Sequence, residues 1–236
     1  MSAQLAIDDL SAGYGELPVL RGIHLEIQAG EIVALVGSNG AGKTTLLRAL
    51  SRVIGFRGTA SFDGHDLAHL TSDQAFALGL VQVPEGRQLF DQMSVEENLL
   101  MGAFRRGDRA GVARSLQEVY GFFPRLYERR RQRACSLSGG EQQMCAVARG
   151  LMAAPKLLAI DEMSLGLAPV VVDQLLDTIV SVRGQGTTVL LVEQDVFAAL
   201  SIADRCYILE TGSIVREGPA KELAEDPQVQ RAFMGL

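Results

Sequence analysis

A run of residues near the start of the chain combines glycines with a lysine and hydroxyls: Gly37, Ser38, Asn39, Gly40, Ala41, Gly42, Lys43, Thr44 and Thr45. Glycines let the backbone curl so that N–H groups point inward, and a helix start adds positive potential; both favour phosphate binding. Lys43 adds a mobile cation, and the Thr44 hydroxyl can ligate Mg²⁺. Apolar residues 32–36 precede the run, and a helix is expected over about 43–53. We therefore predict a loop that binds the β- and γ-phosphates of a nucleotide.

Two carboxylates follow an apolar run later in the chain. Residues 157–160 are apolar, and Asp161 and Glu162 come directly after them. If this run is a buried parallel strand, it ends at the edge of the sheet where ligands bind in open α/β folds. Asp161 would then hold Mg²⁺, and Glu162 would orient or deprotonate an attacking water. Two solvated acids at a strand end are the alternative, which the glycine-rich run upstream disfavours.

A third segment, residues 137–143, has the pattern of a helix start. Ser138 and Glu141 have the spacing of a capping box. The apolar stripe of a helix continues beyond them at Met144, Val147, Leu151 and Met152. A cap does not need Gly139 and Gly140, whereas bare glycines at a helix start leave N–H groups open to an anion. Two anion-binding helix starts in one chain indicate that they meet across two subunits.

The composition narrows the class of protein. The chain has 236 residues, 47% of them hydrophobic, which suits one large domain or a core with a lobe. A net charge of −6 argues against nucleic acid as a partner. No apolar run approaches the roughly 18 residues of a membrane helix, and residues 1–10 lack the pattern of a signal peptide. The three cysteines, Cys135, Cys145 and Cys206, are expected to be reduced and buried.

Apolar strands that alternate with amphipathic helices predict a buried parallel sheet. The expected strands cover residues 5–10, 23–27, 32–36, 59–62, 80–83, 157–160, 187–192 and 206–209. Between the 157–160 and 187–192 strands, a helix with one apolar face is expected to begin near Pro169. The stretch from about 95 to 153 is helical in pattern and interrupts the alternation. We interpret the chain as a single domain, with a core of about 1–86 and 155–236 and an inserted helical lobe of about 87–154.

In their order and types, these motifs resemble those of the ABC ATPase family, whose LSGGE/Q signature matches residues 137–142. The resemblance covers essentially the whole chain. It implies an α/β fold: a P-loop NTPase core with a mostly parallel sheet, an N-terminal antiparallel β region and an inserted α-helical lobe. It also implies ATP and Mg²⁺ as cofactors. In the implied head-to-tail dimer, ATP lies between the phosphate loop of one copy and Ser138, Gly139, Gly140 and Glu141 of the other. Tyr14 matches the aromatic residue that stacks on adenine in this family.

The chain departs from the usual family pattern at several positions. Glu85 stands where most members have a glutamine, and we count it among the candidate metal ligands with Thr44 and Asp161. Gln194 stands where most members have a histidine, and Met163 replaces a proline. Losing a cationic contact of this kind commonly costs around 10²–10³-fold in rate. Because Glu162 is present, we expect an active site formed by Glu162, Gln194 and Lys43, with a slower rate.

The same departures resemble the second ATP-binding subunit of the branched-chain amino-acid importer. That resemblance implies two transmembrane permease subunits, a second ATP-binding subunit, and a periplasmic or extracellular solute-binding protein that acts indirectly. It places the chain at the cytoplasmic face of the cell membrane, as part of a homo- or heterodimer. The similar urea-importer subunit more often has glutamine at the position of Glu85, so Glu85 favours amino acids. A soluble ABC ATPase of translation or DNA repair is the rival, which the single ATPase unit and the lack of heptads disfavour.

Two further groups of residues admit simple interpretations. Residues 129–131 and Arg133 form a basic run before the 137–143 segment. A solvated helix end explains this run, and contact with lipid headgroups or a membrane subunit is the alternative. His24, His65 and His69 lack the spacing of a metal site, so we expect surface or packing roles for them.

Overall fold

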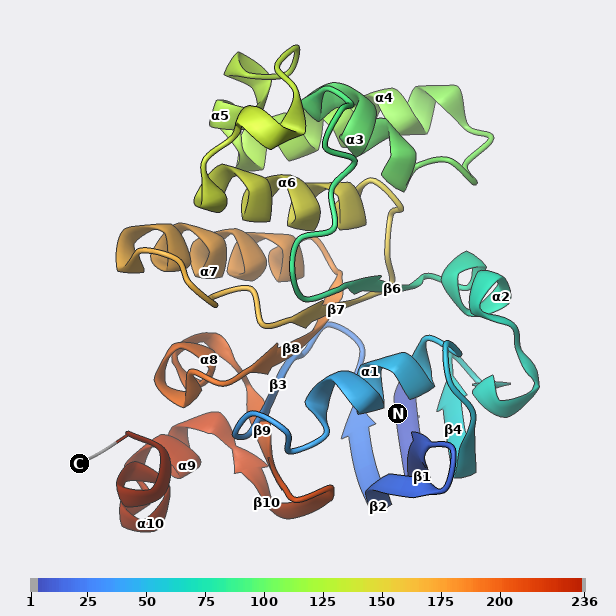
Figure 1. The fold of residues 1–236 in the computed structure, drawn as a ribbon, viewed down its shortest axis with the longest axis vertical. Helices are drawn as coiled ribbons and strands as arrows, with labels where there is room; N and C mark the ends of the chain where they lie inside the picture. Colours follow the sequence, from blue (N-terminus) through green and yellow to red (C-terminus); the bar gives the residue numbers. More distant parts are fainter. Residues whose placement is uncertain (1–3, 235–236) are drawn as a thin grey trace.

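Two β-sheets and the helices packed against them form the fold of residues 4–234, which the computed structural model describes (Figure 1). The strands are β1 (Leu5–Tyr14), β2 (Leu17–Ile27), β3 (Ile32–Val36), β4 (Phe56–Phe62), β5 (His65–Asp66), β6 (Leu80–Val83), β7 (Leu157–Asp161), β8 (Thr188–Glu193), β9 (Arg205–Glu210) and β10 (Ser213–Pro219). The helices are α1 (Lys43–Leu50), α2 (Ser72–Ala77), α3 (Val95–Gly102), α4 (Arg109–Phe122), α5 (Pro124–Glu128), α6 (Gly139–Leu151), α7 (Pro169–Gly184), α8 (Val196–Ile202), α9 (Ala220–Glu225) and α10 (Pro227–Val229).

The larger sheet carries the strands that precede the predicted motifs. Its order is β10-β9-β3-β8-β7-β6, and every neighbouring pair is parallel except β10 with β9. The pairing of Val36 with Glu193 and of Asp161 with Val192 places the carboxyl ends of β3, β7 and β8 side by side. The predicted parallel sheet is therefore confirmed, and its ends bring distant motifs together.

The central strands are apolar throughout because both faces of the sheet are covered. Every residue of β3, β7 and β8 is buried. Alternate side chains enter two different cores, so that Ala34 of β3 faces one and Leu35 the other. The first core lies against α6, α7 and α8 and the second against α1 and the smaller sheet. The site thus rests on strand ends that are fixed from both sides.

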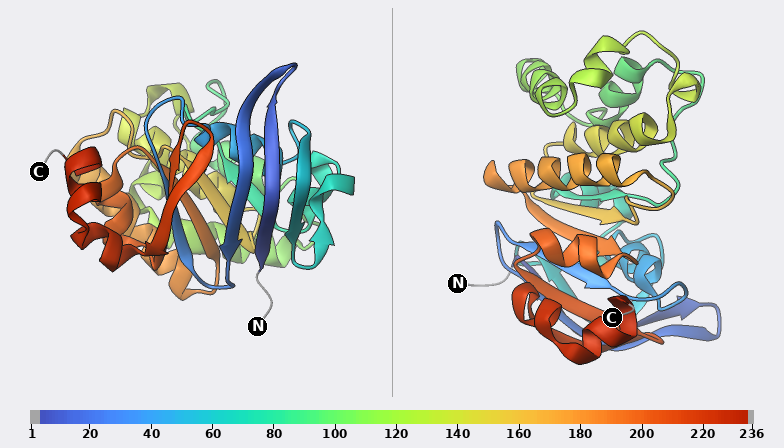
Figure 2. Two further views of the ribbon diagram at one scale, coloured as in Figure 1. Left: turned by 90° about the horizontal axis from the view of Figure 1, so that it is seen from below. Right: turned by 90° about the vertical axis from the view of Figure 1, so that its left-hand side faces the viewer.

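The smaller sheet is antiparallel, as expected, with the order β2-β1-β4-β5. Figure 2 shows it at the end of the molecule away from α3, α4 and α5. Its first hairpin is longer than the expected strands, since β1 continues to Tyr14 and β2 begins at Leu17. Register shifts interrupt the pairing of β1, and Asp9 has a positive φ of 51°. These irregularities break the period-two pattern and explain why the predicted strands are shorter than the observed ones.

The helices between β6 and β7 form the upper end of the molecule in Figure 1. They are α3, α4, α5 and α6, as the helical pattern predicts. The α6 stripe is confirmed because Met144, Val147, Leu151 and Met152 are all buried. In α7, Pro169 is the first residue and the predicted apolar face is inward. The boundary of the inserted lobe at about 87–154 stays a prediction.

Some sequence expectations are wrong in detail. The helix α1 ends at Leu50 and not near 53, because the chain turns there and Arg52 has a left-handed φ of 59°. The edge strand β10 was not predicted, since its alternation is polar and half exposed. Cys135 is exposed, whereas Cys145 and Cys206 are buried as expected. Cys135 lies in a short 3-10 turn, Ala134–Ser136, in which only the alanine is buried.

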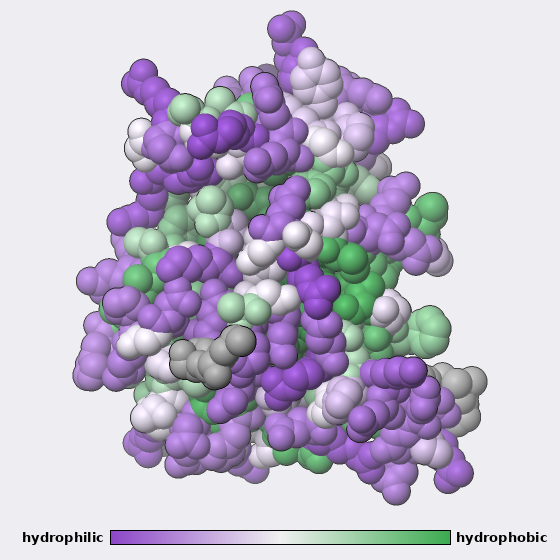
Figure 3. All heavy atoms as spheres, turned by 180° about the vertical axis from the view of Figure 1, so that it is seen from behind, coloured by the Kyte–Doolittle hydropathy of each residue, from purple (hydrophilic) through white to green (hydrophobic). Residues whose placement is uncertain are grey.

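The outer surface is mostly hydrophilic on the face drawn in Figure 3, with a hydrophobic area at mid-height level with α7 and α8. Both helices carry exposed large apolar side chains, namely Val170, Val180 and Phe197. His24 and His69 lie on the surface, 2.7 Å from Asp8 and 3.5 Å from Asp66 respectively. Within residues 4–234, no helix is both long and apolar enough to span a bilayer.

Candidate nucleotide-binding site

The predicted phosphate loop joins β3 to α1. Its glycines have conformations that other residues rarely adopt: φ is 81° at Gly40 and 111° at Gly42. A Cβ atom at Gly37 would overlap the carbonyl oxygen of Leu209, and one at Gly42 would lie 2.8 Å from the Leu20 side chain. Ser38, Asn39 and Gly40 are exposed at the tip. The loop is therefore tightly curled and open toward solvent, as a phosphate site requires.

Lys43 is the first residue of α1 and lies inside this loop. Its ammonium donates hydrogen bonds to the carbonyl oxygens of Gly37 at 2.7 Å and Ser38 at 3.1 Å. It also lies 3.1 Å from Oε1 of Glu162, and both side chains are almost fully buried. The fold thus brings together a lysine and a carboxylate that the sequence had placed in separate motifs.

Asp161 ends β7 beside the loop and is completely buried. Neither carboxylate oxygen has a partner at hydrogen-bond geometry among the described residues. Burial raises the pKa of Asp161 to about 6; the Thr44 hydroxyl opposes this rise, and the charges of Glu162 and Glu85 add to it. Buried oxygen atoms with unused lone pairs are costly unless a cation or donor meets them. Asp161 and Thr44 therefore fit a divalent cation such as Mg²⁺, which prefers oxygen ligands.

Glu162 occupies a tight turn immediately after β7. Its φ is 47°, in the left-handed region that disfavours residues with a side chain. Its backbone N–H donates to the carbonyl oxygen of Val192 on β8 at 2.8 Å. This turn directs the carboxylate toward Lys43. Glu162 is thus an acid held beside the phosphate loop, where a water attacking a phosphate would need a base.

Glu193 is a second buried acid that the sequence analysis did not single out. It is the last residue of β8 and only 2% exposed. Its two carboxylate oxygens accept hydrogen bonds from the N–H and the hydroxyl of Ser164, at 3.0 and 2.6 Å. Burial raises the pKa of Glu193 to about 7, and the charges of Glu162 and Asp195 contribute. An acidic residue that closes an otherwise apolar strand was the signal that could have found it.

The remaining predicted core residues lie around this centre. Glu85 is exposed beyond β6, yet its charge raises the pKa of Asp161. Gln194 is exposed directly after β8, and its side chain makes no hydrogen bond within residues 4–234. Tyr14 is 42% exposed, and its hydroxyl accepts a hydrogen bond from Arg48 of α1 at 3.1 Å. The ring is thus open to a partner. Gln194 follows the end of β8, next to the ends of β3 and β7, and its place in the site stays a prediction.

The helix start at Ser138 has the predicted capping box. The Ser138 hydroxyl accepts from the Glu141 N–H at 3.3 Å, and the Glu141 carboxylate accepts from the Ser138 N–H at 2.9 Å. In Figure 1, α6 and α7 both begin on the left-hand side, above the ends of β7 and β8. The helix start is thus well formed, but no described hydrogen bond or ion pair joins it to the phosphate loop of the same chain.

Two arginines surround this helix start. The guanidinium of Arg87 lies over Gly139 and donates to the Gln142 side chain at 3.1 Å. Arg129 forms an ion pair with Glu141, with a nitrogen–oxygen distance of 2.6 Å. The interpretation of residues 129–131 as merely solvated is therefore wrong for Arg129. Its positive charge compensates an acid whose pKa the Ser138 hydrogen bonds also lower.

The same span that holds the loop, the α6 helix start and the acidic turn matches a family model described as ABC transporter, over residues 20–164. The chain belongs to the ABC transporter family. This ABC chain is 44% identical to BraG of Pseudomonas aeruginosa, a high-affinity branched-chain amino acid transport ATP-binding protein, over 98% of its own length and 99% of BraG. It is 34% identical to LivF of Archaeoglobus fulgidus, a probable branched-chain amino acid transport ATP-binding protein, over 96% and 97% of the two chains.

The fold comparison agrees with this assignment. The crystal structure of the ADP conformation of an ATP-binding cassette from an ABC transporter superimposes with a TM-score of 0.86. It covers 100% of both chains at 24% sequence identity, which establishes the shared fold. As a member of this family, homologous to ATP-hydrolysing transporter subunits, the ABC chain is an ATPase and binds nucleotide.

Proposed function

We propose that this ATPase powers a membrane importer of branched-chain amino acids, from the cytoplasmic face of the membrane. One observation carries this proposal: the 44% identity to BraG extends over nearly the whole of both chains. Such coverage includes the segments by which transporter ATPases differ, not only the shared phosphate loop. Glu85, in place of the usual glutamine, also favours amino acids over urea.

The chemistry assigned to the site is ATP hydrolysis with Glu162 as the base. Backbone N–H groups of residues 37–42 bind the phosphates, and Lys43 neutralises their charge. Asp161 and Thr44 would hold Mg²⁺, with Glu85 as a further candidate; the ion supplies positive charge that offsets the developing charge on phosphate. A phosphate that enters the loop competes with Glu162 for Lys43. Glu162 is then free to orient and deprotonate the attacking water.

The second half of the site is assigned to another ATPase domain. The N–H groups of Gly139 and Gly140 and the hydroxyl proton of Ser138 are suited to a γ-phosphate, whereas the Ser138 N–H already donates to Glu141. No described hydrogen bond or ion pair joins them to the phosphate loop of their own chain. We assign them to ATP bound by the partner domain, in a head-to-tail dimer with a copy of this chain or a different ATPase. Tyr14, whose ring is exposed near α1, is assigned to the adenine base.

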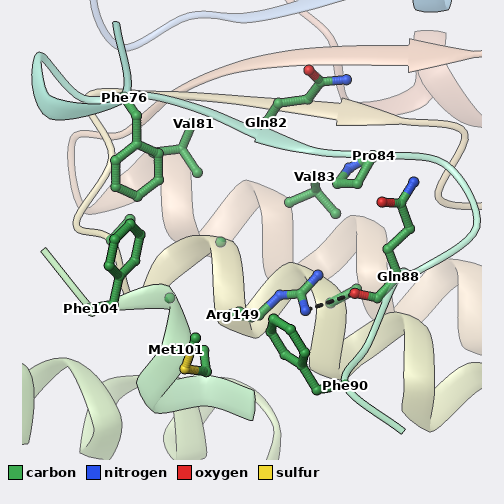
Figure 4. Close-up of a pocket in the computed structure, with 14 residues that line it drawn as sticks. Phe76, Val81, Gln82, Val83, Pro84, Gln88, Phe90, Met101, Phe104 and Arg149 are labelled. Atoms are coloured by element: carbon green, nitrogen blue, oxygen red, sulfur yellow. Dashed lines mark hydrogen bonds between the residues drawn. The ribbon is translucent and has the colours of Figure 1, made fainter. Parts of the chain in front are cut away.

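The permease subunits are assigned to an apolar groove lined mainly by β6, α3 and α6 (Figure 4). Its volume is about 300 Å³. In Figure 4, the rings of Phe76 and Phe104 lie at one end and that of Phe90 at the other. Phe104 is 64% exposed, and Arg149 holds the groove wall by donating to the carbonyl oxygen of Gln88 at 2.8 Å. A short helix with an apolar face from a cytoplasmic permease loop suits such a groove.

Uptake measurements test the proposal. Cells that lack this chain should lose uptake of labelled leucine, isoleucine and valine and regain it with the wild-type chain. The Glu162→Gln variant should not restore it. If the cells lose urea uptake and keep normal leucine uptake, the transported solute is urea and not branched-chain amino acids. Normal uptake of both would contradict a role in import of either.

A further inference from the structure

A buried carboxylate lies where the strand pattern calls for an apolar side chain. Glu193 is 2% exposed, follows apolar residues of β8, and pairs across the sheet with Val36. Burying a carboxylate costs free energy unless hydrogen bonds offset the loss of hydration. An apolar residue would avoid that cost, so the contacts of Glu193 should reveal what the carboxylate does.

Both oxygens of Glu193 bind one residue of a neighbouring turn. Ser164 donates its backbone N–H to Oε1 at 3.0 Å and its hydroxyl to Oε2 at 2.6 Å. Glu162, at the start of the same turn, donates its N–H to the carbonyl oxygen of Val192 at 2.8 Å. The turn is therefore joined at both ends to the last two residues of β8, with Glu193 providing the side-chain bonds.

The turn needs such support because of its backbone conformation. Glu162 has a φ of 47°, which is unfavourable for a residue with a side chain and persists only when its surroundings maintain it. In this conformation its carboxylate lies 3.1 Å from the Lys43 ammonium. We therefore expect the turn to relax without the Ser164 bonds, which would move the Glu162 carboxylate away from the phosphate loop.

We propose that Glu193 is a positioning residue for ATP hydrolysis. Its carboxylate fixes Ser164 and thereby holds Glu162 in the left-handed conformation that faces Lys43. Because Glu193 directly precedes Gln194, it also fixes the spacing between the Glu162 turn and the segment after β8. This inference rests on the catalytic role proposed for Glu162.

Three variants test this role through turnover and ATP affinity measured separately. Glu193→Ala should lower kcat roughly 10- to 100-fold, as misplacement of a catalytic group does, with ATP affinity within about twofold of wild type. Glu193→Gln should retain most of the activity, because its amide oxygen can accept from the Ser164 N–H while its nitrogen donates to the hydroxyl. Ser164→Ala keeps the backbone bond and should give a smaller loss. The Glu193→Ala/Ser164→Ala double variant should be no slower than Glu193→Ala alone.

Thr188→Val is the matched control. Thr188 is buried at the opposite end of β8, where its hydroxyl accepts from the Gly30 N–H at 2.9 Å. Thr188→Val should have a lower melting temperature than wild type and an unchanged kcat.

A wild-type kcat in Glu193→Ala, or equal losses of kcat in Glu193→Ala and Glu193→Gln, would overturn the proposal. Normal turnover in Glu162→Gln would show that the proposed catalytic site is wrong. If Glu162→Gln is inactive and Glu193→Ala has normal turnover, the catalytic site stands and only the positioning role of Glu193 is wrong.

Discussion

The Lys43 ammonium lies 3.1 Å from the Glu162 carboxylate, and the two side chains are only 3% and 8% exposed. Lys43 begins α1 and Glu162 follows β7, so this contact joins the phosphate loop to the acidic turn. Each charge compensates for the other's loss of hydration, and removal of either leaves an unpaired buried charge. In the proposed function, a nucleotide phosphate would compete for the same lysine. We therefore expect phosphate binding to change the contacts of Glu162.

Replacing the loop lysine should weaken nucleotide binding strongly. In Lys43→Ala the phosphates lose a charged donor, which is worth about 1.5–3 kcal/mol, or roughly 10- to 100-fold in affinity. Titration with a fluorescent ATP analogue measures this loss. Lys156→Ala is the control, because Lys156 pairs with Asp63 at a different place and should bind ATP normally. Equal affinity of Lys43→Ala and wild type would refute the phosphate-loop assignment.

Gln194 should act as a neutral hydrogen-bond partner of the phosphate. Wild-type ATPase activity should then show no titration step near about pH 6.5 from this position. Gln194→His should introduce such a step and raise turnover, since a cationic donor stabilises developing charge. Gln194→Ala should slow turnover less than Glu162→Gln. Wild-type rates in Gln194→Ala, together with no new step in Gln194→His, would remove Gln194 from the site.

Stability should fall as pH rises through the range in which Glu193 titrates. Its pKa is raised from 4.5 to about 7 in the folded chain, so the folded state binds more protons than the unfolded state between these values. The contribution of Glu193 to the free energy of unfolding is fully present below its pKa in the unfolded state. This contribution is lost as the pH rises through its pKa in the folded state. Asp161, with its pKa raised to about 6, acts in the same direction.

The Glu193→Gln variant isolates the contribution of Glu193 to the pH dependence of stability, because glutamine does not titrate. Relative to the variant, the free energy of unfolding of wild type should fall by about 1–3 kcal/mol between about pH 4.5 and pH 7. Urea denaturation at several pH values without Mg²⁺ measures the difference. A constant difference across the range would show that Glu193 has an ordinary pKa.

The groove variant Phe104→Glu should separate permease binding from catalysis. A charge in the apolar groove should reduce co-sedimentation of the chain with permease-containing membranes, while the ATPase rate of the isolated chain stays unchanged. Val53→Glu, at a similarly exposed apolar residue after α1, is the control and should bind membranes normally. Equal membrane binding by Phe104→Glu and wild type would place the permease elsewhere.

The sheet and the motif-bearing helices could be predicted because their signals are local. The apolar run before Asp161 indicates a buried strand, and Ser138 with Glu141 indicates a helix start; the structure has both. The irregular β1–β2 hairpin and the polar edge strand β10 were missed or shortened. In those segments, bulges and half exposure erase the periodicity on which the prediction depends.

Contacts between distant segments could not be predicted from one sequence. Arg129 looked like part of a solvated run, yet it pairs with Glu141. Glu193 was not predicted to belong to the site, yet it is buried and accepts two hydrogen bonds from Ser164. Each pairing depends on how a loop approaches a helix or strand that is distant in the sequence, which local patterns do not encode. The roles of Tyr14, Glu85 and Gln194 stay predictions.

Turnover of Glu162→Gln in the presence of ATP and Mg²⁺ tests the central claim most directly. The glutamine keeps the size of the side chain but cannot accept the proton of the attacking water. We predict near-complete loss of phosphate release, with ATP affinity retained and a new ATP-dependent dimer peak in size-exclusion chromatography. Phosphate release at the wild-type rate by this variant would contradict the account.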